Sequence, residues 1–219
     1  MFGHTKLDTP KKLIDSQYTV RNVRGSKYLS PSSIEGCSRA LYYHLKMIPA
    51  KSVTPISLQR LFDRGNYSEE LLASHIEKSG MLVARQIDLY NDDPPIHGKI
   101  DFLFIFEGEL GIIEHTTKEY YAFQNLHAAP PNKFKQWNLY SGLTGIKTGY
   151  VTVDGGLSTS PKWFPVTFDE CQFSIDLEKL LAVQKAVKED TPPTPEEQFV
   201  FGSEACLRCP YFSLCYPKD

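Results

Sequence analysis

The stretch from His97 to Lys118 reads HGKIDFLFIFEGELGIIEHTTK and decides the fold. It contains two apolar, strand-like runs joined by Glu107-Gly108-Glu109, which is typical of a β-hairpin turn. The first run carries Asp101 and the second carries Glu114. Burial of a carboxylate without a partner is costly, so a divalent cation is one candidate partner for the two acids. The alternative for each acid is a salt bridge or an exposed strand edge.

A third acid lies upstream, in a run with helical spacing. Residues 56–78 place apolar side chains at helical intervals and include Glu69. Together Glu69, Asp101 and Glu114 would supply the hard oxygen ligands that Mg²⁺ or Mn²⁺ prefers. The sequence therefore predicts a candidate metal site made by one helix and one hairpin.

The remaining patterns predict an α/β (α+β) protein. Ser30 is a candidate N-cap with Pro31 at the first helical position, which indicates a helix that continues through Cys37. The expected strands are 81–90, 96–106, 110–117, 148–153 and 162–168, and the expected helices are 30–45, 56–78, 133–143 and 176–189. Residues 1–28 are expected to be an N-terminal arm, and the proline-rich stretch 191–195 a stiff linker.

Four cysteines have the spacing of a metal or cluster site. Cys206, Cys209 and Cys215 form a C-x2-C-x5-C group, and Cys37 lies far upstream. Four thiolates suit an iron–sulfur cluster, and they also suit a closed tetrahedral zinc site. Two disulfides are a further alternative, but the polar first residues do not resemble a signal peptide. The fifth cysteine, Cys171, is expected to be an ordinary packed thiol.

Composition limits the possible functions. The 219 residues are 41% hydrophobic and 23% charged, which is typical of a globular protein with a sizeable core. The net charge of −2 and pI near 6.3 provide no global attraction to nucleic acid. Lysines such as Lys133, Lys135 and Lys147 are scattered, which usually indicates a solvated surface. No apolar run is long enough to cross a bilayer, and we expect a cytoplasmic protein.

Four motifs together resemble a known family. They are G-x-x-x-E at 65–69, G-x-x-D at 98–101, the strand acid Glu114 and Q-x-x-x-Y at 136–140. This order resembles RecB-type PD-(D/E)XK nucleases, and with the four cysteines it is similar to the iron–sulfur RecB-like exonucleases associated with CRISPR systems and found in phages. Each motif alone is weak, and the order carries the resemblance.

The resemblance implies a fold and a cofactor. It implies one RecB-like nuclease domain at 29–219, with a restriction-endonuclease-like mixed sheet flanked by helices. It also implies a [4Fe-4S] cluster held by the four cysteines, in a lobe made by the helix at 30–45 and the segment 196–219. This lobe would join the N- and C-terminal parts of the chain.

The resemblance also implies an activity, namely metal-dependent cleavage of DNA from its ends, chiefly of single strands. The implied ligands of Mg²⁺ or Mn²⁺ are Glu69, Asp101, Glu114 and the backbone carbonyl of His115, while Gln136 and Tyr140 would position phosphate or water. The expected setting is replication, recombination, repair or CRISPR adaptation in a bacterial, archaeal or phage-infected cell. Expected partners besides DNA are a helicase, an integrase or a replication or recombination protein.

The chain departs from the family pattern at one catalytic position. The family has a lysine two residues after the strand acid, where this chain has Thr116. Strand alternation places Lys118 on the same face as Glu114, ~7 Å beyond Thr116 at ~3.3 Å per residue. Lys118 is therefore a candidate catalytic lysine that has moved along the strand. The alternative function is a catalytically degenerate nuclease fold that serves as a DNA-binding or assembly subunit.

Overall fold

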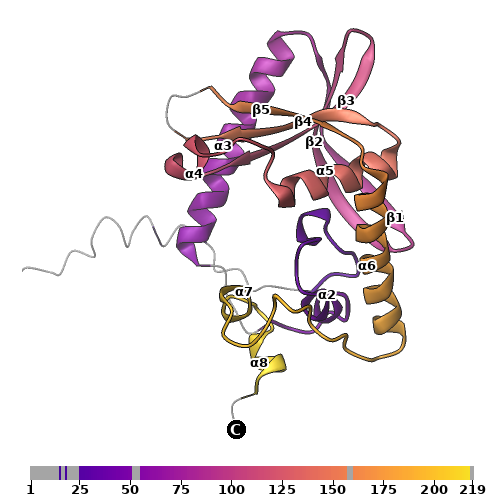
Figure 1. Ribbon diagram of the computed structural model, residues 1–219. Coiled ribbons are helices and arrows are strands. Elements are labelled where there is room, and N and C mark those ends of the chain that lie inside the picture. The colour runs from indigo at the N-terminus through magenta and orange to yellow at the C-terminus, as the bar shows by residue number, and fades with distance from the viewer. Residues whose placement is uncertain (1–14, 16–17, 19–24, 51–54, 157–159, 218–219) are drawn as a thin grey trace, which may run out of the picture.

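A five-stranded mixed sheet forms the centre of the molecule (Figure 1). The computed structural model describes residues 15, 18, 25–50, 55–156 and 160–217. The strands are β1 (Leu82–Asp92), β2 (Pro95–Phe106), β3 (Glu109–Thr117), β4 (Thr148–Asp154) and β5 (Lys162–Thr167), in that spatial order. All neighbours are antiparallel except β3 and β4, which are parallel. The predicted hairpin at 107–109 therefore joins β2 and β3.

Helices cover both faces of the sheet, which confirms the predicted mixed sheet flanked by helices. The long helix α3 (Ile56–Lys78) packs on one face, and α5 (Pro131–Thr144) packs on the other. The other elements are η1 (Pro31–Ser33), α2 (Ser38–Leu45), α4 (Tyr120–Gln124), α6 (Glu170–Lys188), α7 (Glu204–Leu207) and α8 (Phe212–Cys215). None of the helices in the described ranges is long and apolar enough to cross a membrane.

Apolar burial explains these layers. On the α3 side, Leu72 and Ile76 pack with Phe102 and Ile113. The cluster on the α5 side is built from Ile100, Ile112, Phe123, Trp137, Tyr140, Val151, Val153 and Val166. Trp137 is fully buried, and its Nε1 donates to the Ile112 carbonyl at 3.1 Å.

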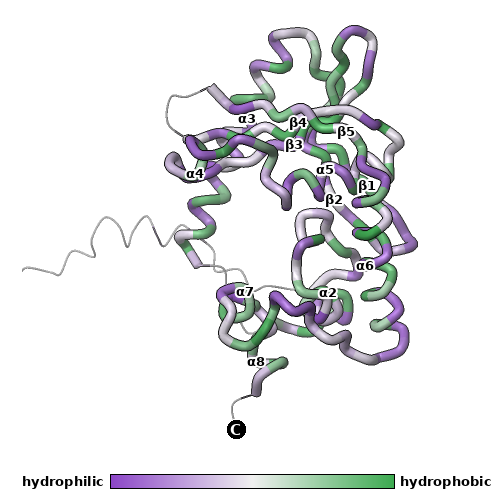
Figure 2. The backbone as a smooth tube through the Cα atoms, viewed as in Figure 1, coloured by the Kyte–Doolittle hydropathy of each residue, from purple (hydrophilic) through white to green (hydrophobic). Residues whose placement is uncertain are grey.

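A third cluster joins α2 to α6 below the sheet and includes Leu41, Tyr42, Leu180 and Val183. The first residues after α6 are mostly hydrophilic (Figure 2), and the chain then returns beside α2 to reach α7 and α8 (Figure 1). Polar contacts hold this return because the Glu196 carboxylate accepts from the Ser38 hydroxyl at 2.6 Å and lies 3.1 Å from the Lys179 ammonium. The N-terminal and C-terminal parts of the chain are therefore in contact.

Two predictions about helices are wrong. The expected continuous helix at 30–45 is split into η1 and α2, because Gly36 interrupts it with a turn in which its N–H donates to the Ser33 carbonyl at 2.8 Å. Cys37 consequently occupies the N-cap of α2 rather than the helix interior. The helix α6 begins at Glu170 instead of 176, so Cys171 lies in its first turn. There Cys171 is exposed and not packed.

The alternation of side chains along β2 is interrupted at Asp101. Residues two apart on a regular strand share one face, yet Ile100 packs in the α5-side cluster and Phe102 in the α3-side cluster. The opposite residue on β1, Gln86, has a positive φ of 52°, and the regular pairing of β2 with β3 extends only from Phe102 to Phe106. The backbone irregularity therefore lies at the first acid of the hairpin.

A methyl group at Gly98 should destabilise the fold, because Gly98 lies against buried side chains. A Cβ there would lie 2.5 Å from the Tyr140 hydroxyl and 2.8 Å from Pro31 Cδ. We expect Gly98→Ala to lower the free energy of unfolding by roughly 1–3 kcal/mol, the usual cost of overpacking. Urea denaturation followed by tryptophan fluorescence measures this change.

The matched control is Gly65→Ala within α3, where a Cβ would meet no atom within 4 Å. Because alanine has the higher helix propensity, this variant should gain about 0.8–1 kcal/mol. Equal effects at both positions would contradict the packing assigned to Gly98.

Candidate active site

Asp101 and Glu114 meet where β2 and β3 separate. The backbone N–H of His115 donates to Asp101 Oδ2 at 2.7 Å, so a side chain replaces a main-chain acceptor at this point of the ladder. Glu114 is 0% exposed, and neither of its carboxylate oxygens has a hydrogen-bond partner in the described structure. The structure thus brings the two hairpin acids together and buries one of them without hydrogen bonds.

Lys133 supplies the nearest positive charge to this pair. It lies in the first turn of α5, with its Nζ 3.5 Å from Glu114 Oε2. The same Nζ donates to Gln136 Oε1 at 3.0 Å, and the side chain is only 19% exposed. From the sequence, Lys133 was expected to be one of several scattered surface lysines. Its position three residues before Gln136, on one helix face, was the signal that could have identified it.

A cavity of about 400 Å³ opens beside these groups. Its lining residues are Leu61, Phe62, Gly65, Asn66, Glu69, Asp101, His115, Thr116, Thr117 and Lys133. The Glu69 carboxylate of α3 accepts a hydrogen bond from the side-chain amide of Gln86 on β1. The predicted acids Glu69 and Asp101 therefore share one cavity with Lys133, and the buried Glu114 lies behind it.

Burial raises the pKa of all three carboxyl groups. The pKa of Glu114 lies well above its ordinary value because the group is desolvated and because Asp101 repels its charge. Burial also raises the pKa of Asp101 and of Glu69, and Asp101 adds to the shift of Glu69. The ammonium of Lys133 opposes each of these shifts. The site therefore holds more acidic side chains than its single lysine can neutralise.

His115 points its imidazole away from Glu114, because successive side chains of a strand lie on opposite faces. Its Nε2 lies 2.8 Å from Ser68 Oγ on α3, and its Nδ1 lies 2.9 Å from Thr152 Oγ1 on β4. Burial lowers the pKa of His115 to about 4, so the ring is neutral at pH 7. The imidazole thus fixes β3 against α3, while the backbone of His115 faces the acid pair.

Of the other predicted residues, Gln136 and Tyr140 face the site and Lys118 does not line it. Gln136 and Tyr140 face the site from α5, and the Tyr140 hydroxyl donates to the Lys99 carbonyl at 2.9 Å. Burial raises the pKa of Tyr140, so the phenol keeps its proton. Lys118 follows β3, where its backbone N–H donates to the Asp154 carbonyl at 2.9 Å, and it is not among the residues that line the cavity.

The acid site fits a hard divalent cation. Two buried oxygens of Glu114 lack hydrogen bonds, and carboxylates are the ligands that Mg²⁺ and Mn²⁺ prefer. In the ranges that the structure describes, no three His, Cys, Asp or Glu side chains converge closely enough to hold one ion. The present partners explain this spread, since Glu69 turns to Gln86 and Asp101 to the His115 amide. Joint ligation would require Glu69 and Asp101 to leave these partners.

The four predicted cysteines surround a second cavity, of about 280 Å³. Cys37 reaches it from the start of α2, and Cys206, Cys209 and Cys215 reach it from the C-terminal segment. Burial raises the pKa of the Cys37 and Cys209 thiols, and the neighbouring sulfur of Cys215 adds to both shifts. The fold therefore brings Cys37 to one cavity with three cysteines that lie 169, 172 and 178 residues later in the sequence.

Comparisons with known proteins identify the fold. No protein-family model matches the chain, and no curated protein matches it by sequence. The crystal structure of SSO0001 aligns with 95% of this chain and 94% of its own, at 12% identity and a TM-score of 0.53. An alkaline exonuclease (LHK-Exo) from Laribacter hongkongensis aligns with 74% of this chain and 89% of its own, at 12% identity and a TM-score of 0.58. The same exonuclease in complex with dAMP gives 13% identity and a TM-score of 0.57 over the same shares. At identities this low, the structural alignments show a shared fold alone.

Removal of the buried charge at Glu114 should stabilise the protein when EDTA is present. Burial raises the pKa of Glu114 in the folded state, so the unfolded chain loses this proton at a lower pH than the folded protein does. The free energy of unfolding therefore falls as pH rises from the unfolded-state pKa to the folded-state pKa. Glu114→Gln should therefore be more stable than the parent by roughly 1–3 kcal/mol at pH 8. The difference should vanish toward about pH 4, near the pKa of an exposed glutamate.

Urea denaturation at the two pH values tests this expectation. The control is Glu109→Gln at the exposed start of β3, which should change stability little at either pH. A Glu114→Gln protein that is less stable than the parent at pH 8 would show that the carboxylate is already well compensated.

Proposed function

We propose that this protein is a divalent-metal-dependent deoxyribonuclease that degrades DNA from its ends, chiefly single strands. The observation that carries the proposal is the buried Glu114 carboxylate, which has no hydrogen bond and lies beside Lys133 and Asp101, two residues that line a cavity. The fold shared with an alkaline exonuclease supports it. The order of motifs in the sequence supports it independently.

The residues have separate roles in this proposal. Glu69, Asp101, Glu114 and the backbone carbonyl of His115 would hold Mg²⁺ or Mn²⁺. When bound, such a cation polarises a phosphodiester oxygen and lowers the pKa of bound water. Gln136, which accepts from Lys133, orients the ammonium toward the acids.

Lys133 supplies the positive charge that the family places at the position of Thr116. In the family pattern this charge comes from β3, whereas here it comes from the first turn of α5 and reaches 3.5 Å from Glu114. Thr116 lines the same cavity, so both positions face one space. A cation fixed there would stabilise negative charge as it develops on the phosphate. Lys118 is the competing candidate for this role, and the two lysines are separable by mutation.

We further propose that Cys37, Cys206, Cys209 and Cys215 hold a [4Fe-4S] cluster. The support is that all four border one cavity between α2 and the C-terminal segment, and that the motif order resembles iron–sulfur exonucleases. Such a cluster would close a long chain loop and stabilise the lobe. Zinc would be the colourless alternative. On the resemblance alone, we place the protein in CRISPR adaptation or in replication, recombination or repair, acting with a helicase or an integrase.

Nuclease activity should depend on Glu114 and Lys133. With end-labelled single-stranded DNA and Mn²⁺, Glu114→Gln should abolish cleavage. Lys133→Ala should lower the cleavage rate roughly 10²–10³-fold, as loss of one donor to a developing charge does. Thr116→Lys in the Lys133→Ala background should restore part of the rate, because it returns a cation to the same cavity.

The matched control is Lys135→Ala, since Lys135 lies on the same helix and pairs with Glu35 at 3.6 Å, away from the acids. It should cleave as the parent does. Loss of activity in Lys118→Ala but not in Lys133→Ala would transfer the catalytic role to Lys118. A parent protein that binds DNA but never cuts it would instead indicate a degenerate DNA-binding or assembly subunit.

Loss of one cluster ligand should remove the iron and destabilise the lobe. Anaerobically purified parent protein should be brown and contain about four iron atoms per chain, whereas Cys206→Ala should be colourless and poorly soluble. Cys171→Ala is the control, because Cys171 is exposed on α6 and does not border the cavity. Iron and zinc analysis decides the outcome, and a stable, zinc-loaded parent would refute the iron–sulfur assignment.

A further inference from the structure

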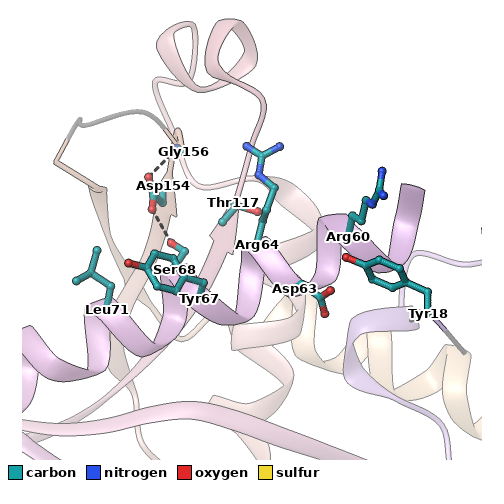
Figure 3. A pocket seen from close by; sticks show the side chains of 10 residues that line it. All are labelled: Tyr18, Arg60, Asp63, Arg64, Tyr67, Ser68, Leu71, Thr117, Asp154 and Gly156. Atoms are coloured by element: carbon teal, nitrogen blue, oxygen red, sulfur yellow. Dashed lines mark hydrogen bonds between the residues drawn. The ribbon is translucent and has the colours of Figure 1, made fainter. Parts of the chain in front are cut away.

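A larger pocket lies on the other flank of α3 from the acid cavity. It has a volume of about 670 Å³ and lies between α3 and the ends of β3 and β4 (Figure 3). Thr117, at the end of β3, lines both this pocket and the acid cavity. The two spaces are therefore adjacent, and α3 separates them.

One flank of α3 presents arginine and tyrosine side chains to this pocket. Arg60, Arg64 and Tyr67 lie on successive helical turns, and Tyr67 is 74% exposed. The Arg64 side chain is 59% exposed, and its ion pair with Glu119 is long, at 3.9 Å. Figure 3 shows both side chains extending from α3 beside the pocket. A solvated aromatic face next to a weakly held guanidinium can bind the π-face of a base.

The pocket floor is polar and well ordered. Asp154 Oδ2 accepts from the Ser68 hydroxyl at 2.5 Å, and its Oδ1 accepts from the Gly156 N–H at 2.8 Å. Protein donors therefore already occupy both oxygens of this carboxylate. Ser68 also contacts the His115 ring at 2.8 Å, and the His115 N–H binds Asp101. The floor is thus connected to the acid pair by consecutive hydrogen bonds.

Charge balance indicates which part of a nucleic acid the pocket would bind. Arg60 and Arg64 carry two positive charges, and Asp63 and Asp154 carry two negative ones. Contacts to phosphate alone would need a net positive groove, so stacking on Tyr67 has to carry much of the affinity. Unpaired bases offer free faces for stacking, whereas a duplex keeps its bases stacked inside.

We infer that this pocket is a binding site for one or two unpaired nucleotides of a DNA single strand, with a base on Tyr67 and the adjoining phosphate at Arg64. Its volume lies within the range of roughly 300–1,000 Å³ that holds small ligands, and it cannot hold a duplex. The inference rests on the proposed nuclease function and extends it. A strand anchored there passes Thr117 to reach the acids, so the pocket selects single-stranded DNA.

Binding measured without cleavage tests this inference. The background is Glu114→Gln, and the probe is a fluorescein-labelled single strand of oligothymidylate in Mg²⁺, followed by fluorescence anisotropy. Tyr67→Ala and Arg64→Ala should each raise Kd at least about fivefold, while Tyr67→Phe should retain the parent Kd. The control is Tyr90→Ala, because Tyr90 is an exposed tyrosine on β1 that stacks on His97 outside the pocket.

An abasic strand of the same length separates stacking from phosphate binding. Tyr67→Ala should have no effect on the Kd of the abasic strand or of a blunt duplex. An unchanged Kd for oligothymidylate in both pocket variants would overturn the inference and leave the nuclease proposal intact. A Glu114→Gln protein that binds no DNA at all would overturn both.

Discussion

The buried carboxylate of Glu114 is the constraint on which the site depends. It is fully buried and accepts no hydrogen bond, and a buried charge of this kind requires a nearby counter-charge. The fold supplies one from α5, where Lys133 reaches 3.5 Å from the carboxylate. It places Asp101 on the other side by interrupting the ladder between β2 and β3. In the proposed nuclease, a divalent cation bound here would add to this counter-charge and stabilise the folded state.

The acid site and the cysteine lobe are held in place by different interactions. The acids belong to a sheet with helices packed on both faces, whose geometry is set by apolar burial. Three of the four cysteines belong to the C-terminal segment, where α7 and α8 have four residues each and no buried residue. Such segments gain little stability from packing, so contacts such as Glu196 with Ser38 and Lys179 hold them in place. A cluster bound by the four thiols would add the missing stability.

Local sequence patterns predicted most of the helices and strands. They failed where a single residue interrupts a helix and where a side chain's neighbours come from distant parts of the chain. Alternation and turn composition predicted the hairpin of β2 and β3, and helical spacing predicted α3 within its observed bounds. The helix at 30–45 was wrong because Gly36 introduces a turn that spacing does not reveal. Lys133 was missed because its approach to Glu114 depends on how α5 crosses β3. Its spacing from Gln136 indicates that the two share a helix face, but not what that face meets.

The sequence by itself determined the mixed α/β class, the hairpin with its two acids and the set of four spaced cysteines, because these follow from local periodicity and residue chemistry. Only the tertiary structure decided which charges meet. It brought Lys133 of α5 to 3.5 Å from Glu114, turned β2 at Asp101 so that Ile100 and Phe102 pack on opposite faces of the sheet, and placed the pocket bordered by Arg64 and Tyr67 next to the acid cavity. Each of these depends on packing between elements far apart in the chain, where burial of apolar faces fixes distances that no local pattern contains.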